Sequence, residues 1–82
     1  MDAAAIYTQL TPIFQDVLDD DALVPHAAMT AHDVEEWDSL RHIRLIVSVE
    51  QALCIKFTTR EIAALENVGQ FVELIQAKLA HA

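Results

Sequence analysis

The apolar positions in the first quarter of the chain recur with the period of a helix. Their spacing predicts a helix over residues 3–18. Pro12 lies inside this stretch, where it removes one backbone donor and crowds the carbonyl of Thr8. A helix that starts at Pro12 after a Thr11 cap is the alternative. Because the apolar stripe runs through Pro12 unchanged, one bent helix is favoured. The stripe consists of Ile6, Leu10, Ile13, Phe14, Val17 and Leu18.

Residues 19–37 show no sustained period and form a long connection. Pro25 biases its predecessor away from helical angles. A connection of this length is uncommon in a compact domain unless it has a function or packs on the helices. Four apolar residues are expected to supply that packing: Leu23, Val24, Met29 and Val34.

Helical spacing returns over residues 39–53. Asp38 is expected to be the N-cap, because its carboxylate can accept from free amides in the first turn. The inward stripe is predicted to contain Ile43, Ile46, Val49 and Leu53, with Leu45 flanking it.

Two shorter signals complete the helical pattern. Thr58 and Glu61 form a capping box that opens a short helix over 59–65, to which Ile62 and Leu65 contribute core contacts. Asn67 is expected to cap a last helix over 68–80. The inward residues of that helix are Val68, Phe71, Val72, Ile75 and Leu79. The pattern predicts an all-α fold: a small four-helix bundle of three main helices and one short one, with a long first loop.

Composition limits the classes of function. The chain has 82 residues, which is enough for a single domain over 1–82. Its formal net charge of −8 disfavours nucleic acid and anionic membranes, whereas basic partner proteins would be attracted. No apolar run approaches the length of a bilayer span, and no secretory signal is recognised. The lone Cys54 excludes an intrachain disulfide, so a cytoplasmic setting is expected. A free-standing monomer is the simplest expectation. Because Cys54 follows Leu53 near the end of the inward stripe, it is expected to be a small core residue.

Candidate chemistry centres on the start of the helix at 39–53. Ser39 directly follows the expected cap, where a side chain should be exposed. Leu40 and Val47 share a stripe turned away from the inward residues, which is typical of a docking surface. Taken alone, each feature is common in structural helices.

The run Glu36-Trp37-Asp38-Ser39-Leu40, with the apolar helix pattern that follows it, resembles the acyl carrier protein family. The resemblance extends to the short helix and to the Asn67-Val68-Gly69 entry of the last helix. Asp-Ser-Leu alone arises by chance in many proteins. With the helix pattern and the chain length it becomes specific.

The resemblance implies a carrier protein that is not itself an enzyme. It implies that a phosphopantetheinyl transferase esterifies the Ser39 hydroxyl with 4′-phosphopantetheine, whose thiol holds acyl cargo as a thioester. Asp38 would cap the helix and help the transferase to recognise the site. The partner-binding residues would be Leu40, Arg41, Arg44 and Val47. Further partners would be an acyl- or aminoacyl-loading ligase and downstream acyl-processing enzymes.

The sequence also departs from the family pattern. Carriers of fatty-acid synthesis usually have small residues before the motif and a strongly acidic second helix. Here Glu36-Trp37 precede the motif, and Arg41, His42 and Arg44 occupy the early turns. We therefore expect a specialised pathway rather than housekeeping fatty-acid synthesis. Two alternatives are an aminoacyl or peptidyl carrier loaded by an adenylating ligase, and a helical interaction module without a prosthetic group.

Two weaker constellations are set aside. Asp38, Ser39 and His42 invite a serine-hydrolase interpretation, but Asp38 is better placed to cap the helix than to orient His42. His26, His32 and the acidic run at 19–21 fit no metal-ligand spacing, so a solvated loop is expected.

Overall fold

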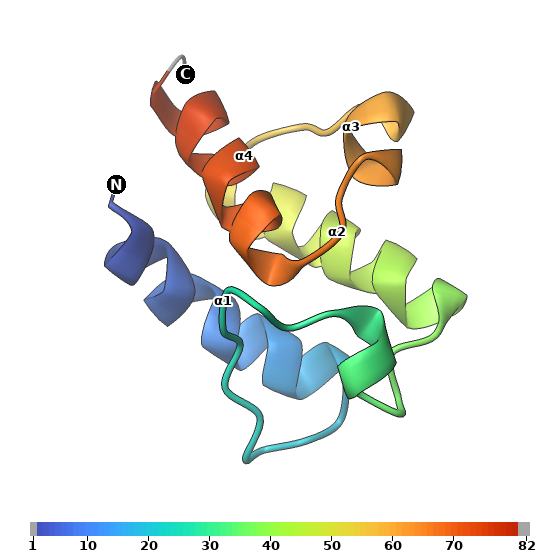
Figure 1. Cartoon of the computed structure of the whole chain (residues 1–82). Coiled ribbons are helices and arrows are strands. Elements are labelled where there is room, and N and C mark those ends of the chain that lie inside the picture. The colour runs from blue at the N-terminus through green and yellow to red at the C-terminus, as the bar shows by residue number, and fades with distance from the viewer. Residues whose placement is uncertain (1, 81–82) are drawn as a thin grey trace.

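The structure is a computed structural model that describes residues 2–80. Over that range the chain forms four α-helices, one short 3₁₀ turn and no strand (Figure 1). The all-α fold predicted from the sequence is confirmed. The elements, in chain order, are α1 (Ala3–Val17), the 3₁₀ turn η1 (Ala31–Asp33), α2 (Ser39–Leu53), α3 (Thr59–Ala63) and α4 (Val68–Ala80).

Helix α1 is the element that packs against both α2 and α4. It runs through Pro12 without a break, and the Thr11 hydroxyl donates to the carbonyl of Tyr7 (2.8 Å) instead of capping a new helix. The helix ends at Val17, one residue before the predicted end. Asp19 adopts φ 55°, a left-handed conformation that ends helical hydrogen bonding.

The hydrophobic core is built from one face each of α1, α2 and α4, closed by the connection after α1. Phe14 lies fully buried at its centre, with its ring edge-on to Trp37 (centroids 5.5 Å apart). Within residues 2–80 no polar or charged side chain is buried. The other fully buried large side chains are Ile6, Leu10, Leu18, Leu45, Ile75, Val49 and Val68.

The inward face of α2 differs from the predicted one. Leu45 was expected to flank the stripe but is only 1% exposed, whereas Ile43, expected inside, is 60% exposed. Ile46 and Val49 are buried as predicted. A helix turns by about 100° per residue. The face that buries Leu45, Ile46 and Val49 therefore leaves Ile43 at its edge, where solvent reaches it.

Cys54 is also placed differently from the prediction. It forms the C-cap of α2 at φ 56°, and its side chain is exposed. The inward stripe, with Val49 buried and Leu53 partly buried, ends one residue earlier, because the left-handed turn redirects the chain.

The connection after α1 packs as predicted at Met29 and Val34, which are buried, and partly at Leu23. The expectation for Val24 is wrong: it is 64% exposed. Val24 directly precedes the buried Pro25, so at this point the chain places the Pro25 ring inward and the Val24 side chain outward.

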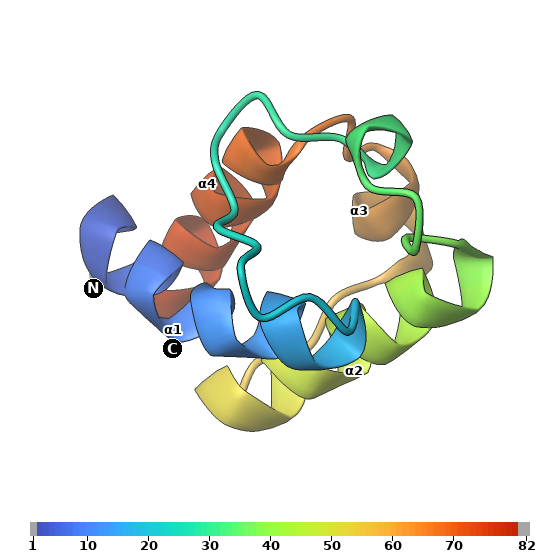
Figure 2. The same cartoon turned by 90° about the horizontal axis from the view of Figure 1, so that it is seen from below.

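The same connection holds the start of α4. The amide of Val68 donates to the carbonyl of Met29, and that of Gly69 to the carbonyl of Ala27, both at 2.9 Å. Figure 2 shows the connection passing this end of α4. A Cβ at Gly69 would lie 3.1 Å from both the Cβ and the carbonyl oxygen of Ala27, so glycine permits the close approach.

Helix α3 begins with the predicted capping box between Thr58 and Glu61, and Glu61 also pairs with Lys78 of α4 (2.9 Å). It ends at Ala63 rather than at 65, because the amide of Leu65 bonds three residues back and tightens the chain into a turn. No helix in the described range is long and apolar enough to cross a membrane.

Candidate functional site

The start of α2 is set by a side-chain cap. Asp38 has extended backbone angles, and its carboxylate accepts from the amide of Arg41 at 2.8 Å, as predicted. Ser39 is therefore the first residue of α2, and its side chain is exposed. The cap thus places a serine hydroxyl in solvent at the amino end of a helix of 15 residues.

This helix start can accept an anion. Within the described residues, the amides of Ser39 and Leu40 donate no hydrogen bond, while that of Arg41 is taken by Asp38. Free amides and the helix dipole both favour negative charge at this end. The Arg41 guanidinium donates to the carbonyl of Glu36 (3.3 Å), which holds a positive charge beside the same turn. A phosphodiester on Ser39 would therefore suit its surroundings.

The outer face of α2 carries an exposed apolar surface, here called the α2 patch and defined as Leu40, Ile43 and Val47. These side chains are 67%, 60% and 43% exposed. The sequence had indicated Leu40 and Val47 but missed Ile43, whose spacing of three residues from Leu40 and four from Val47 was the available signal.

The charged residues next to the α2 patch are positive, whereas the chain as a whole is negative. Arg41 is half-buried and Arg44 is exposed, three residues from Val47 and four from Leu40. Glu50, the acidic residue of α2, uses its carboxylate to accept from the amide of Phe57 (2.8 Å). The α2 patch is therefore flanked by positive charge on a protein with a net charge of −8.

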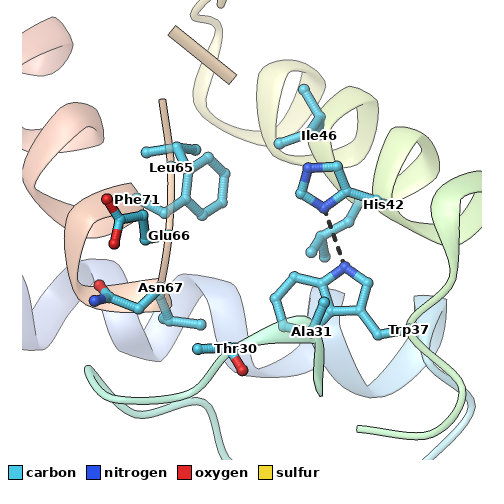
Figure 3. A pocket seen from close by; sticks show the side chains of 11 residues that line it. Thr30, Ala31, Trp37, His42, Ile46, Leu65, Glu66, Asn67 and Phe71 are labelled. Atoms are coloured by element: carbon cyan, nitrogen blue, oxygen red, sulfur yellow. Dashed lines mark hydrogen bonds between the residues drawn. The ribbon is translucent and has the colours of Figure 1, made fainter. Parts of the chain in front are cut away.

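A cavity of about 90 Å³ lies behind α2, between this helix, η1 and the segment that joins α3 to α4 (Figure 3). Trp37 and His42 form one wall. The indole Nε1–H donates to Nδ1 of His42 at 3.1 Å, and the two rings stack with centroids 6.0 Å apart. The remaining lining is mainly apolar, from Ala31, Leu45, Ile46, Leu65, Val68 and Phe71, with Thr30, Glu66 and Asn67 as its polar members.

Burial and the Trp37 hydrogen bond both favour the neutral form of the His42 imidazole. Burial lowers the pKa of His42 below its usual value of 6.5. Protonation would also place a hydrogen on Nδ1, facing the indole donor, and so break the bond. His42 is therefore neutral at pH 7. The serine-hydrolase arrangement is not formed, because Nδ1 meets Trp37 and the Asp38 carboxylate meets a backbone amide.

We expect the depressed pKa of His42 to make stability depend on pH. A histidine whose folded-state pKa lies below 6.5 stabilises the fold fully above pH 6.5, and this contribution is lost as pH falls toward the folded-state pKa. Melting temperatures of the wild type and His42→Phe, measured between about pH 7.5 and 5.5, should show a steeper loss for the wild type. A ¹⁵N titration that put the His42 midpoint at or above 6.5 would contradict this.

Comparison with known proteins finds similarity among solved structures. No family model matches the chain, and no curated protein matches it. Among solved structures, the chain is similar to the solution NMR structure of the holo acyl carrier protein from Geobacter metallireducens. The two sequences are 45% identical, with a TM-score of 0.86, and the match covers 92% of this chain and 86% of that chain.

Proposed function

The chain belongs to the acyl carrier protein family, and on this basis we propose that it carries an acyl-type cargo on a 4′-phosphopantetheine arm attached to Ser39. The observation that carries the proposal is the exposed Ser39 hydroxyl at the capped start of α2. A hydroxyl that must be modified by another enzyme has to be reachable, and this one is. When bound, the arm supplies a thiol that holds the cargo as a thioester.

The residues around Ser39 have distinct tasks in this proposal. The Asp38 carboxylate fixes where α2 begins and thereby orients the Ser39 hydroxyl outward. The free amides of Ser39 and Leu40, with the Arg41 guanidinium, offset the charge of a phosphodiester. The chain itself makes and breaks no bond of the cargo. It presents the cargo to its partners, which gains effective concentration at each of them.

The α2 patch, with Arg41 and Arg44, is the proposed partner-binding surface. It adjoins Ser39 on the same helix, so an enzyme that reaches the arm must approach this face. Its positive flanks would repel a basic docking site and favour one with acidic residues. This supports a specialised pathway, because enzymes adapted to carriers with a strongly acidic second helix would meet like charge here.

One experiment tests the carrier function. The purified protein is incubated with a broad-specificity phosphopantetheinyl transferase and coenzyme A, and its intact mass is measured. A carrier gains the mass of one arm, whereas an interaction module without a prosthetic group gains nothing. Efficient loading and elongation by housekeeping fatty-acid enzymes would refute the specialised pathway but leave the carrier function standing.

We expect Leu40→Ala to lower the kcat/KM of the transferase by about tenfold. Truncating an interface residue typically costs about 1.4 kcal/mol of binding free energy, which corresponds to this factor. The melting temperature should hardly change, because Leu40 is 67% exposed. Val24→Ala is the matched control: Val24 is 64% exposed but lies in the connection, away from α2. If Leu40→Ala and Val24→Ala lowered kcat/KM equally, the α2 patch would not be part of the docking surface.

A further inference from the structure

A groove lies at the far end of α2 from Ser39, between the segment that follows α2 and the second half of α4 (Figure 1). Its volume is about 460 Å³, which falls within the range of about 300–1,000 Å³ that is typical of ligand sites. A helix of 15 residues is about 22 Å long. An occupant of the groove would therefore leave Ser39 and the α2 patch uncovered.

The groove offers positive charge on an otherwise acidic protein. Nine of the 13 acidic residues lie within the first 38 residues, and all five lysines and arginines follow them. Glu61, the carboxylate that lines the groove, accepts from the amide of Thr58 and pairs with Lys78 at 2.9 Å. Lys56 lines the groove, is exposed and forms no salt bridge within the described residues. Its ammonium group is therefore free to bind an anionic side chain.

The segment after α2 also presents an unpaired backbone edge. Its side chains alternate as in a strand: Ile55 is buried, Lys56 exposed and Phe57 half-buried. The amides of Ile55 and Phe57 both donate to Glu50, to its carbonyl at 3.2 Å and to its carboxylate at 2.8 Å. Over the described part of the chain, the amide of Lys56 donates no hydrogen bond and its carbonyl accepts none. Lys56 thus offers one donor and one acceptor to an added strand.

Strand pairing determines which side chains suit the occupant. A residue directly opposite Lys56 in an added strand projects to the same outward side, with its Cβ about 4.5–5.5 Å away, so an acidic side chain there forms a cross-strand ion pair. The two neighbours of that residue project to the opposite face, as Ile55 and Phe57 do. The half-buried Leu74 lines the groove and gives these neighbours an apolar contact. The fitting occupant is a short extended segment in which apolar and acidic residues alternate.

We propose that this groove binds an extended segment of a partner protein in which acidic and apolar residues alternate. The backbone of the segment pairs with Lys56, its carboxylate binds the Lys56 ammonium group, and its apolar side chains cover Leu74. A partner bound in this way leaves the Ser39 hydroxyl and the α2 patch accessible. The groove is thus a second point of attachment, and it does not depend on whether Ser39 carries an arm.

The test titrates the intact protein with three acetylated and amidated pentapeptides, in which leucine alternates with glutamate, glutamine or lysine. ¹H–¹⁵N spectra follow the Lys56 amide. The alkylation rate of Cys54 is a second readout, because this single cysteine is exposed and lines the groove. We expect the glutamate peptide to bind at least about tenfold tighter than the lysine peptide, to shift the Lys56 amide downfield and to slow alkylation.

Two variants with the same change of charge separate the groove from general electrostatics. Lys56→Glu should weaken binding of the glutamate peptide at least about tenfold. Arg60→Glu, at an exposed position of α3 that does not line the groove, should weaken it less than about threefold. Both side chains are exposed, so neither change should lower the melting temperature appreciably.

Three results would each overturn the proposal: equal affinities for the three peptides, equal losses in Lys56→Glu and Arg60→Glu, or a Lys56 amide that does not shift. None of them would affect the carrier function, which is tested separately by the gain of mass at Ser39.

Discussion

Replacing Ser39 with alanine is expected to abolish the mass gain that follows incubation with a phosphopantetheinyl transferase and coenzyme A. The change removes the proposed nucleophilic oxygen but keeps the backbone amide and the Asp38 cap, so α2 should begin at the same residue. Stability should change by no more than about 0.5 kcal/mol, as for most exposed positions. The loss of modification would then report on the hydroxyl alone.

The chain offers a matched control for this variant. Its two serines are Ser39 and Ser48, and both lie on α2. Ser39 is exposed in the first turn, whereas Ser48 is half-buried in the third. Ser48→Ala should therefore load like the wild type. A mass gain that persists in Ser39→Ala, or vanishes in Ser48→Ala, would place the arm elsewhere.

The largest effect on stability is expected from Phe14→Ala. The Phe14 side chain is fully buried and contacts Trp37 edge-on, so its removal leaves a cavity that the helices cannot fill. Such truncations cost about 3–5 kcal/mol, against a total of about 5–15 kcal/mol for a whole domain. Urea titration followed by circular dichroism should show a much lower midpoint.

Ile43→Ala is the control for that measurement. It removes a similarly large apolar side chain, but from a position that is 60% exposed. We expect a change of at most about 0.5 kcal/mol. If Ile43→Ala destabilised the protein as much as Phe14→Ala, the assignment of the inner and outer faces of α2 would be wrong.

Local signals predicted the helix starts well. Asp38 accepts from a backbone amide three residues ahead, as does Asn67, whose side-chain oxygen accepts from the amide of Gln70 at 2.8 Å. Thr58 and Glu61 form the expected reciprocal pair. Each of these contacts closes within one helical turn, so a short stretch of sequence contains all of its atoms.

The wrong predictions concern side chains whose burial depends on contacts with another part of the fold. Helix α2 has apolar residues around much of its circumference, and only the placement of α1 determines that Leu45 lies inside and Ile43 outside. Val24 was expected to pack on the helices because it is apolar, and Cys54 because it follows the inward stripe, but both are exposed. Their exposure follows from backbone turns that the sequence pattern does not specify.

The candidate site was predictable in part for the same reason. Ser39 and Asp38 are neighbours, so the motif and the cap could be recognised together. The cavity could not be, because its walls come from η1, from α2 and from the segment between α3 and α4. The bond between Trp37 and His42 joins residues five positions apart, but its orientation depends on Phe14 from α1.

The two hydrogen bonds from Val68 and Gly69 to the connection have a consequence for how the chain can be engineered. Residues about forty positions apart hold each other in place there, so cutting or lengthening the backbone near Ala27 or Met29 would also loosen the first turn of α4. An affinity tag or reporter domain grafted into this connection belongs instead beside the exposed Asp21 and Ala22, which within the described residues make no hydrogen bond to α4.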